Sequence, residues 1–373
     1  MGRWPVIAEN PLLERPESPV PENPVPENPV LAEVIRSGFA ESRHRGTAVG
    51  LRADAAVAVS AGAATVPVFP RSSNKPLQAA AMLRSGLDLD GQLLALAAAS
   101  HSGQDFHVAG VRQILAAAGL DEDALQCPPD LPLGEEAQRA LLRAGTGPAR
   151  VYMNCSGKHA AMLVTCVRAG WPTASYTDPG HPLQLAIAAT VAELAGEPVA
   201  AVGVDGCGAP VLAISVTGLA RAFRRLVLAE PGTPERRVAD AMRAYPAWTS
   251  GTTRPECELM TAVPGLLLKA GAEGVEAFAL ADGRSGALKI EDGSQRARTP
   301  VTVALLRELG VADVPGADLA VLESMSVGPV TGGGRLVGEV RAALPVAPAA
   351  AGAGGTAAAG LWLAGVLATA SPC

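Results

Sequence analysis

Ser72 and Lys75 are the first residues whose types and spacing suggest chemistry. Short apolar segments with strand character precede Ser72, and an alanine-rich helical pattern begins at Leu77. If the first helical turn includes Lys75, the two side chains lie three residues apart on one face. A serine hydroxyl beside an amine is a nucleophile beside its possible base. The plainer interpretation is an N-cap serine with a solvated lysine, and so short a pattern does not exclude it.

A second hydroxyl and a second lysine occur further along the chain. Ser100 and His101 stand between one apolar helical pattern and the next, where a loop and an N-cap are the structural interpretation. Lys269 ends an apolar strand pattern beside Gly271, a glycine that allows close backbone approach. A lysine in this position resembles the Lys-Thr/Ser-Gly element of Ser-x-x-Lys enzymes, whereas the alternative is a strand-end lysine that reaches solvent.

Two cysteines lie in stretches that could bind a ligand. Cys155, Lys158 and His159 occupy one turn at the start of a predicted helix, and a helix N-terminus lowers a thiol pKa and binds anions. Cys207 follows a strand pattern in a glycine-bracketed turn that begins at Asp205. The chain has no Cys-x-x-Cys pair, so a standard structural zinc site is absent. The two thiols and a nitrogen from Lys158 or His159 could hold a metal, and ordinary buried thiols are the alternative.

The composition argues against several classes of function. The chain has 373 residues, of which 49% are hydrophobic and 18% charged, so it can bury a large core. The net charge is -6 and no basic run occurs, which argues against nucleic acid as a partner. Residues 1–20 contain no apolar run, and the apolar stretch 357–370 is shorter than a membrane span. With six scattered cysteines in a chain that needs no disulfides, we expect a soluble cytoplasmic protein with no membrane partner.

The order of the predicted elements favours an α/β protein of the α+β type. Strands come first, then a block of helices, then further strands and a final helix, and such segregation indicates an antiparallel sheet flanked by helices plus a helical lobe. A nucleophile at a strand-to-helix junction can then lie between the two lobes. We predict strands at 30–35, 48–51, 55–59, 66–69, 199–204, 266–269, 277–281 and 287–290, and helices at 76–86, 91–99, 105–118, 135–145, 157–169, 182–195, 234–244 and 300–309.

Low-complexity segments stand at both ends of the sequence. Residues 1–28 contain a Pro-Val-Pro-Glu-Asn repeat that favours polyproline II, and we expect a disordered extension there. Residues 345–373 are rich in alanine and glycine and are expected to form a low-complexity tail. One domain, residues 29–344, is left between them.

Taken together, the motifs resemble the rhizobial-type, thermolabile L-asparaginases of the asparaginase II family. The resemblance covers residues 29–335 in the right order, and Cys-Ser-Gly-Lys-His and Asp-Gly-Cys are specific to that family, whereas Ser-x-x-Lys is not. Gln104 stands where relatives often have glutamate, and the region after Gly334 does not resemble their usual ending. The residues that carry the resemblance are His44-Arg45, 71–76, 99–102, 154–159, 205–207, 269–274 and 289–293.

The resemblance implies a serine β-lactamase/glutaminase-like fold and the hydrolysis of L-asparagine to L-aspartate and ammonia. It also implies a homodimer and two catalytic pairs, Ser72 with Lys75 and Ser100 with Lys269. The zinc ion that family members bind maps to Cys155, Lys158 and Cys207. For substrate binding we expect Arg71, His101, Asp205 and Cys257; Arg71 and Asp205 match pocket residues, and Cys257 matches a cysteine near the site.

A mechanism follows as a hypothesis. Burial and nearby cations can lower a lysine pKa from about 10.4 by several units, so a neutral Lys75 could take the proton of Ser72. Ser72 would then attack the amide carbon of asparagine, with backbone N–H groups near Ser72 binding the developing oxyanion. Ser100 and Lys269 would relay protons, or Ser100 would be the alternative nucleophile.

Other functions compete with this hypothesis. A glutaminase or another Ser-x-x-Lys amidohydrolase of the β-lactamase-like superfamily is the nearest. A penicillin-binding protein or β-lactamase is disfavoured, because the chain has no export signal and no Ser-Asp-Asn. A non-catalytic metal-binding scaffold belongs to a different class, and the presence of both serines and both lysines argues against it.

Overall fold

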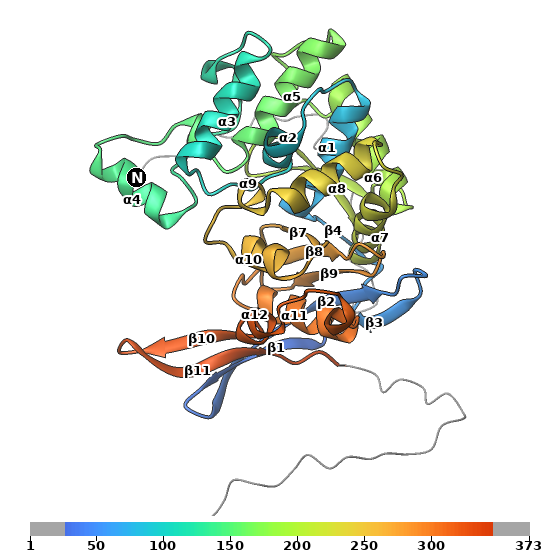
Figure 1. Ribbon diagram of the computed structural model, residues 1–373, viewed down its shortest axis with the longest axis vertical. Coiled ribbons are helices and arrows are strands. Elements are labelled where there is room, and N and C mark those ends of the chain that lie inside the picture. The colour runs from blue at the N-terminus through green and yellow to red at the C-terminus, as the bar shows by residue number, and fades with distance from the viewer. Residues whose placement is uncertain (1–26, 346–373) are drawn as a thin grey trace, which may run out of the picture.

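One antiparallel sheet forms the centre of the molecule. The computed structural model describes residues 27–345, and the strands of this sheet follow the order β10-β11-β1-β2-β9-β8-β7, with β3 paired to β2. Because β1 lies between β2 and β11, the beginning and the end of the described chain are side by side (Figure 1). The strands are β1 (Val30–Arg36), β2 (Phe39–Leu51), β3 (Val57–Ala61), β7 (Leu267–Ala270), β8 (Val275–Ala279), β9 (Ser285–Ile290), β10 (Val327–Gly332) and β11 (Arg335–Ala342).

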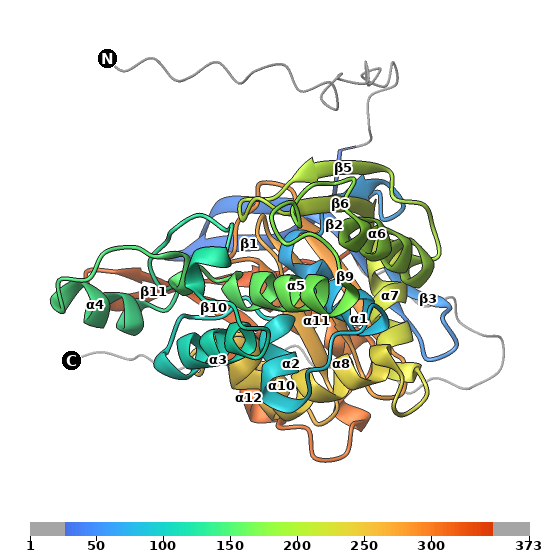
Figure 2. The ribbon, with the colours of Figure 1, turned by 90° about the horizontal axis from the view of Figure 1, so that it is seen from above.

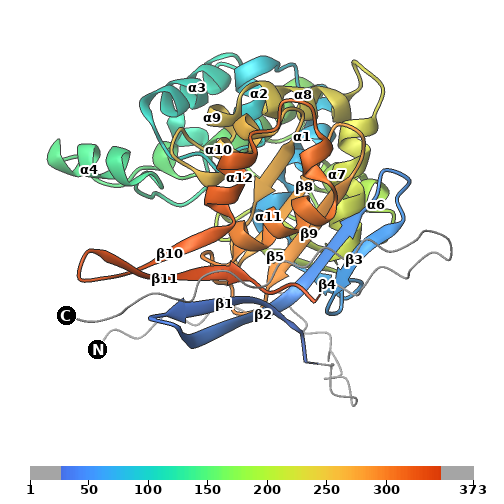
Figure 3. The same cartoon turned by 60° about the horizontal axis from the view of Figure 1, so that its bottom comes forward.

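Helices cover both faces of this sheet. Successive strand residues point to opposite faces, so in β8 Ala277 belongs to one hydrophobic core and Phe278 to the other. The helix α7 (Val216–Leu228) packs on the first face against β2, β8 and β9. The second face is covered by α11 (Arg298–Glu308), with α10 (Pro255–Ala262) and α12 (Leu319–Met325) beside it (Figure 3).

A lobe of helices stands at one end of the sheet (Figure 1). Figure 2 looks down on this lobe and shows α5 over its middle, beside α1, α2 and α3. The lobe contains α1 (Lys75–Arg84), α2 (Gly91–Ala97), α3 (Asp105–Ala116), α4 (Glu135–Arg143), α5 (Ser156–Ala169), α6 (Pro182–Ala195), α8 (Pro234–Ala244) and α9 (Pro246–Thr249).

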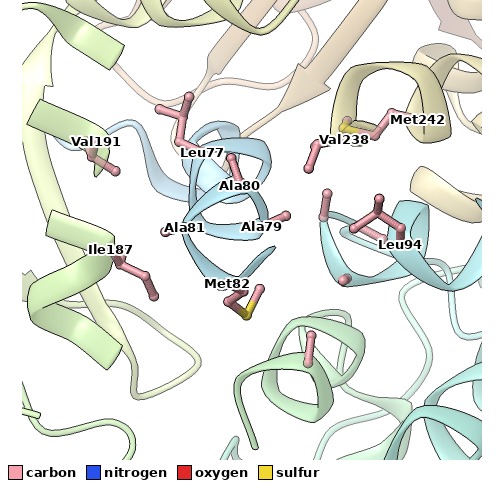
Figure 4. Close-up of a cluster of buried hydrophobic side chains, with 14 of the residues drawn as sticks. Leu77, Ala79, Ala80, Ala81, Met82, Leu94, Ile187, Val191, Val238 and Met242 are labelled. Atoms are coloured by element: carbon pink, nitrogen blue, oxygen red, sulfur yellow. The ribbon is translucent and has the colours of Figure 1, made fainter. Parts of the chain in front are cut away.

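The helix α1 is buried on all sides. Every residue from Lys75 to Leu83 is buried, as expected for a helix that is apolar around its whole circumference. Its alanines favour a helix and let neighbouring helices approach closely, and Pro76 stands in the first turn, where its missing N–H costs nothing. This burial carries Lys75 into the interior. Figure 4 shows the side chains around α1: Ile187 and Val191 of α6, Leu94 of α2, and Val238 and Met242 of α8.

A second, three-stranded sheet positions the segment that precedes α1. Its order is β4-β6-β5, and both outer strands pair with β6. The strand β4 leads into a short 3-10 helix, η2 (Arg71–Asn74), and β5 leads into the turn 205–208. The shared partner strand therefore brings η2 and this turn close together. The strands are β4 (Pro67–Val68), β5 (Ala201–Val204) and β6 (Pro210–Ser215).

The predicted fold class is confirmed as an antiparallel sheet flanked by helices together with a helical lobe. Every predicted strand and helix overlaps one in the structure. The chain after Gly334 forms β11, which pairs with β1 in the sheet, although its sequence is unlike the usual family ending. The elements that the prediction missed are α7, α9, α10, α12, β6, β10 and β11.

Most of the two predicted terminal segments lies outside the described residues. Of the first segment, only Glu27 and Asn28 are described. Glu27 pairs with Arg45 at 3.1 Å, and the side-chain oxygen of Asn28 accepts a hydrogen bond from Thr47 Oγ1 at 3.3 Å. These contacts extend the folded part slightly beyond the predicted start at residue 29. Between residues 27 and 345, no helix has the length and apolar character needed to cross a membrane.

Candidate active site

The hydroxyl of Ser100 lies between two buried lysine amines. Lys75 Nζ, on the first residue of α1, is 3.0 Å from Ser100 Oγ, and Lys269 Nζ, in β7, is 2.8 Å from it. Lys75 also donates to Ala99 O, and Lys269 to Ala270 O, each at 2.6 Å. Ser100 belongs to the loop that follows α2. Three segments that are distant in the sequence therefore meet at one hydroxyl.

One of the two lysines can accept a proton from this hydroxyl. Burial lowers the pKa of Lys269 well below its usual value, and the positive charge of Lys75 adds to the shift. A buried lysine beside a second cation favours its neutral form, whose lone pair can accept a proton. Lys269 is therefore the group at Ser100 that is prepared to act as a base.

Ser72 lies in η2 and is partly exposed, whereas Ser100 is only 9% exposed. Arg71, just before it, has a φ of 52°, and this left-handed conformation costs a non-glycine residue about 1–2 kcal/mol. Such strain persists where the surroundings hold it, often at active sites. No hydrogen bond joins Ser72 to Lys75 in the described part of the chain. The amine of Lys75 instead reaches Ala99 O and Ser100 Oγ, the polar groups buried beside it.

Backbone N–H groups distinguish the two serines. Ser100 N–H donates to Thr249 O at 3.1 Å, and the next N–H, that of His101, donates to Asn154 O at 3.1 Å. Within residues 27–345, Ser72 N–H donates to no backbone carbonyl, as expected for the first turn of a helix. A donor for a developing negative charge is therefore available at Ser72 and is already occupied at Ser100.

A cavity of about 1030 Å³ opens over both serines. Asn154 and residues 270–272, at the end of β7, line it beside Ser72 and Ser100, and its other part is lined by α12, β10 and the start of α11. Pockets for drug-sized ligands occupy about 300–1,000 Å³. The cavity is therefore large enough for a small amide and for groups attached to it.

Gly271 brings the end of β7 against η2. A Cβ atom added at this position would lie 2.6 Å from Pro70 O and 2.9 Å from Ser73 Oγ, so only glycine permits the contact. The hydroxyl of Ser73 also donates to Lys269 O at 3.0 Å. These two contacts fix the position of Lys269 relative to η2.

A buried group of ions supports the same end of β7. Arg298 lies 2.8 Å from Glu256 and 3.2 Å from Glu276, and it donates to Gly271 O at 3.4 Å. Burial alone would raise the pKa of Glu256, but Arg298 and Arg254 outweigh it, so the pKa is lowered. These residues were not among those predicted from the sequence. Glu276, inside an otherwise apolar strand, was the available signal, because a buried carboxylate needs a partner.

Arg71 and Asp205 pair with each other. Arg71 Nε donates to Asp205 Oδ1 at 2.8 Å, and the same oxygen accepts from Gly206 N–H at 2.9 Å. Arg71 also lies 3.8 Å from Glu273. The pair ties η2 to the turn after β5, and its predicted role in substrate binding stays a prediction.

The predicted metal ligands come together in the interior. Lys158 Nζ donates to Cys207 Sγ at 3.1 Å, and Cys155 Sγ lies 2.9 Å from Asn154 Oδ1. A hydrogen bond from Cys155, together with the charge of Lys158, holds the pKa of Cys207 far below its usual value. The Nδ1 of His159 forms a hydrogen bond with the hydroxyl of Tyr176. The buried Nε2 of His159 has no hydrogen-bond partner among the described residues. Asn154 links this cluster to the cavity.

His101 does not line the cavity. Its Nδ1 accepts from Gly103 N–H at 3.1 Å, so its Nε2 carries the hydrogen and donates to Ser156 Oγ at 2.8 Å. Burial, together with the charges of His107 and Lys75, lowers the pKa of His101 well below its usual value. Both nitrogens are thus engaged. The structure favours a role in which His101 holds the Ser100 loop in place, and it does not favour the contact with substrate that we expected.

Cys257 lies on α10. It does not line the large cavity. Instead it lines a neighbouring cavity of about 550 Å³ with Thr253, Glu258 and Asp318, and Arg254 borders both cavities. The surroundings of Cys257 therefore do not favour a direct contact with a substrate held at Ser72 or Ser100.

A compositional signal for these sites was present in the sequence. Of 30 lysine and arginine residues, only Lys75, Lys158, Lys269 and Lys289 are lysines. The first three are buried. Arginine is effectively always charged, whereas a buried lysine can give up its proton. Of these three, Lys269 has a pKa that burial lowers well below its usual value, whereas the pKa of Lys158 is raised, because the charges of Cys207 and Cys155 outweigh its burial.

Comparisons with known proteins place the chain in a family. The family model described as L-asparaginase II matches residues 32–342, and the protein belongs to that family.

No curated protein matches the chain. Among solved structures, it is similar to Mglu in its native form, with 16% identity over 70% of this chain and 63% of that chain and a TM-score of 0.38. For Mglu in its tris and glutamate form, the values are 17% identity, 78% and 65% coverage and a TM-score of 0.33. The chain thus spans less than two thirds of the length of these two structures.

Proposed function

We propose that the protein hydrolyses the side-chain amide of L-asparagine to L-aspartate and ammonia. The observation that carries this proposal is the hydroxyl of Ser100 between the amines of Lys75 and Lys269, in the wall of a cavity that Ser72 also lines. A buried lysine next to a hydroxyl supplies general-base catalysis for attack on an amide. Membership of the L-asparaginase II family supports an amide as the substrate.

Ser72 is the nucleophile in this proposal. It lines the cavity, is more exposed than Ser100 and has an available backbone N–H. That N–H and the N–H of Ala272, which donates to no backbone carbonyl in the described residues, are the candidate donors to the oxyanion. Ser100, whose own N–H is occupied, is the proton relay.

The proton path uses the hydrogen bonds around Ser100. Neutral Lys269 takes the hydroxyl proton of Ser100, and Ser100 takes a proton from Lys75. The neutral amine of Lys75 then accepts the proton of Ser72 as Ser72 Oγ bonds to the amide carbon. The carbon–nitrogen bond breaks, a proton returns along the same path to the nitrogen, and ammonia leaves. Water attacks the acyl-enzyme with the same base and releases aspartate.

Zinc is proposed for the cluster of Cys155, Lys158 and Cys207. Two sulfurs and an amine suit zinc, and the buried Nε2 of His159 has no hydrogen-bond partner within residues 27–345. No three His, Cys, Asp or Glu side chains within residues 27–345 are grouped to hold a metal, so the third donor would be Lys158. A bound zinc would keep the thiols ionised and hold Asn154 at the cavity wall.

The test is ammonia release from L-asparagine and L-glutamine by the purified protein. We expect turnover of asparagine, and a higher kcat/KM with asparagine than with glutamine. Ammonia release from glutamine alone would assign the protein to the glutaminases, and release from neither would overturn the proposal. The proposed homodimer is tested separately by light scattering coupled to size-exclusion chromatography.

A further inference from the structure

Among residues 27–345, four arginines and no acidic residue line the cavity. Charged side chains of one sign on a cavity wall raise the local concentration of ligands of the opposite sign. Three of the four arginines are paired with carboxylates of the protein. The pairs are Arg36 with Glu41 at 2.9 Å, Arg254 with Glu256 at 3.1 Å, and Arg298 with Glu256 at 2.8 Å and Glu276 at 3.2 Å.

The fourth arginine, Arg296, is held by uncharged groups. Its Nε donates to His44 Nε2 at 3.0 Å, and its Nη2 lies 3.2 Å from Ser42 Oγ. His44 is 3% exposed, and its Nδ1 lies 2.7 Å from Asp292 Oδ2. Because Nε2 accepts from Arg296, the hydrogen of the neutral ring is on Nδ1 and is donated to Asp292. Asp292 therefore fixes the ring, and the ring fixes the guanidinium.

This arrangement orients Arg296 without neutralising it. The Nε side of the guanidinium is used by His44 and Ser42, and the opposite end, with Nη1, makes no hydrogen bond to any residue within 27–345. No carboxylate of these residues lies within salt-bridge distance of Arg296 either. A planar guanidinium with a free end matches a carboxylate in a bidentate geometry. Among residues 27–345, Arg296 is thus the one cavity arginine whose charge is left for a ligand.

We propose that Arg296 binds a carboxylate of the amide substrate and thereby selects substrates that carry one. This inference rests on the proposed function. The carboxylate has two possible sources, the α-carboxylate of asparagine itself or the terminal carboxylate of a short peptide that begins with asparagine. The cavity volume of about 1030 Å³ accommodates both. His44 and Asp292 are positioning residues, because they act on the ligand only through Arg296.

The test compares three substrates that differ in their carboxylate: L-asparagine, its α-methyl ester, and the dipeptide asparaginyl-glycine. Loss of a hydrogen bond to a charged group predicts that Arg296→Gln lowers kcat/KM by about 10- to 100-fold, mainly through KM. A loss confined to asparagine assigns the α-carboxylate, and a loss confined to the dipeptide assigns the terminal carboxylate. The methyl ester should be unaffected. An equal loss with the ester, or no loss with any substrate, overturns the proposal.

The control variant is Arg335→Gln. It removes the same charge from an exposed position in β11 that does not line the cavity, and it should leave all three substrates unchanged. If the purified protein releases ammonia from none of them, the proposed function has failed. Ligand binding then tests separately whether Arg296 binds a carboxylate. Calorimetry should show L-aspartate or aspartyl-glycine binding more weakly to Arg296→Gln than to the unmodified protein. Equal binding to both proteins, or binding to neither, would contradict the proposal that Arg296 binds a carboxylate.

The positioning role of His44 has its own readout. Replacing His44 with alanine should raise KM for the carboxylate substrates, yet add almost nothing in the Arg296→Gln background, because both changes remove one interaction. His44→Gln, which offers an acceptor of similar reach, should restore part of the loss. Additive effects of the two substitutions would show that His44 acts independently of Arg296.

Discussion

Ser100 Oγ lies 2.8 Å from Lys269 Nζ, although 169 positions separate the two residues in the chain. Lys75 approaches the same oxygen from α1 at 3.0 Å. The contact requires the end of β7 to press against η2, which the missing side chain of Gly271 permits. One serine thus connects both buried lysines, and the other serine faces the cavity beside them.

Substitution of the two serines separates the nucleophile from the relay. Ser72→Ala should lower kcat by about 1,000-fold or more, because no covalent intermediate can form. Ser100→Ala should lower it by about 100-fold and still accumulate an acyl-enzyme, since a general acid–base group contributes about 10²–10⁴. Intact-protein mass spectrometry of quenched reactions checks both. An acyl adduct in Ser72→Ala, but not in Ser100→Ala, would reverse the assignment.

Lys269→Arg tests whether the amine must lose its proton. Arginine has a similar reach but stays protonated and cannot act as a base, so we expect kcat to fall by about 100-fold or more. Lys289→Arg is the matched control, since Lys289 does not line the cavity. Activity within a few-fold of the unmodified protein in Lys269→Arg would remove Lys269 from the proton path.

The lowered pKa of Lys269 also predicts how stability depends on pH. Between that pKa and the ordinary value of about 10.4, the unfolded chain binds more protons than the folded one. The free energy of unfolding should therefore rise with pH through this window and be lowest below it. In Lys269→Met this contribution is absent, so urea denaturation between about pH 6 and 9 should give a shallower rise. Parallel curves for the two proteins would contradict the prediction.

Gly271→Ala tests the contact between β7 and η2. The new methyl group would meet Pro70 O, a backbone atom that cannot rotate away. We expect a loss of about 1–3 kcal/mol in the free energy of unfolding and a lower kcat. Gly147→Ala is the matched control, because no atom lies within 4 Å of its added Cβ. Equal effects of the two substitutions on stability and kcat would contradict the importance of the contact.

The metal proposal predicts zinc in protein purified without chelator. Elemental analysis should find zinc in the unmodified protein and in Cys257→Ser, and little in Cys207→Ser. Because the lysine ligand must be deprotonated, zinc retention should fall as the pH is lowered. Removal of the metal should lower the melting temperature, since a ligand that binds only the folded state stabilises it. Zinc-free protein with full activity would refute the proposal.

Much of the fold was predictable because its signals are local. Helices such as α6 begin and end at residues that commonly stand at helix ends. Pro182 is at the start of α6, and Gly196 follows its last residue. The missed helices α9 and α10 also begin at a proline but have only 4 and 8 residues, whereas other missed elements give weaker local signals. Every residue of β6 is buried, so its pattern does not alternate, and α7 follows it without a glycine or proline between them. The strands β10 and β11 are separated by glycines and are mostly exposed or half-buried.

The sequence by itself determined which residue types are present and in which order: two serines, two lysines, two cysteine motifs and a predominantly helical middle. Only the tertiary structure decided which of them touch. It placed Lys75 against Ser100, turned His101 away from the cavity and left Arg296 without a carboxylate partner in the part of the chain that the structure describes. The physical reason is that these contacts join segments far apart in the chain. Strand pairing and burial bring such segments together, and no periodicity within one segment records them.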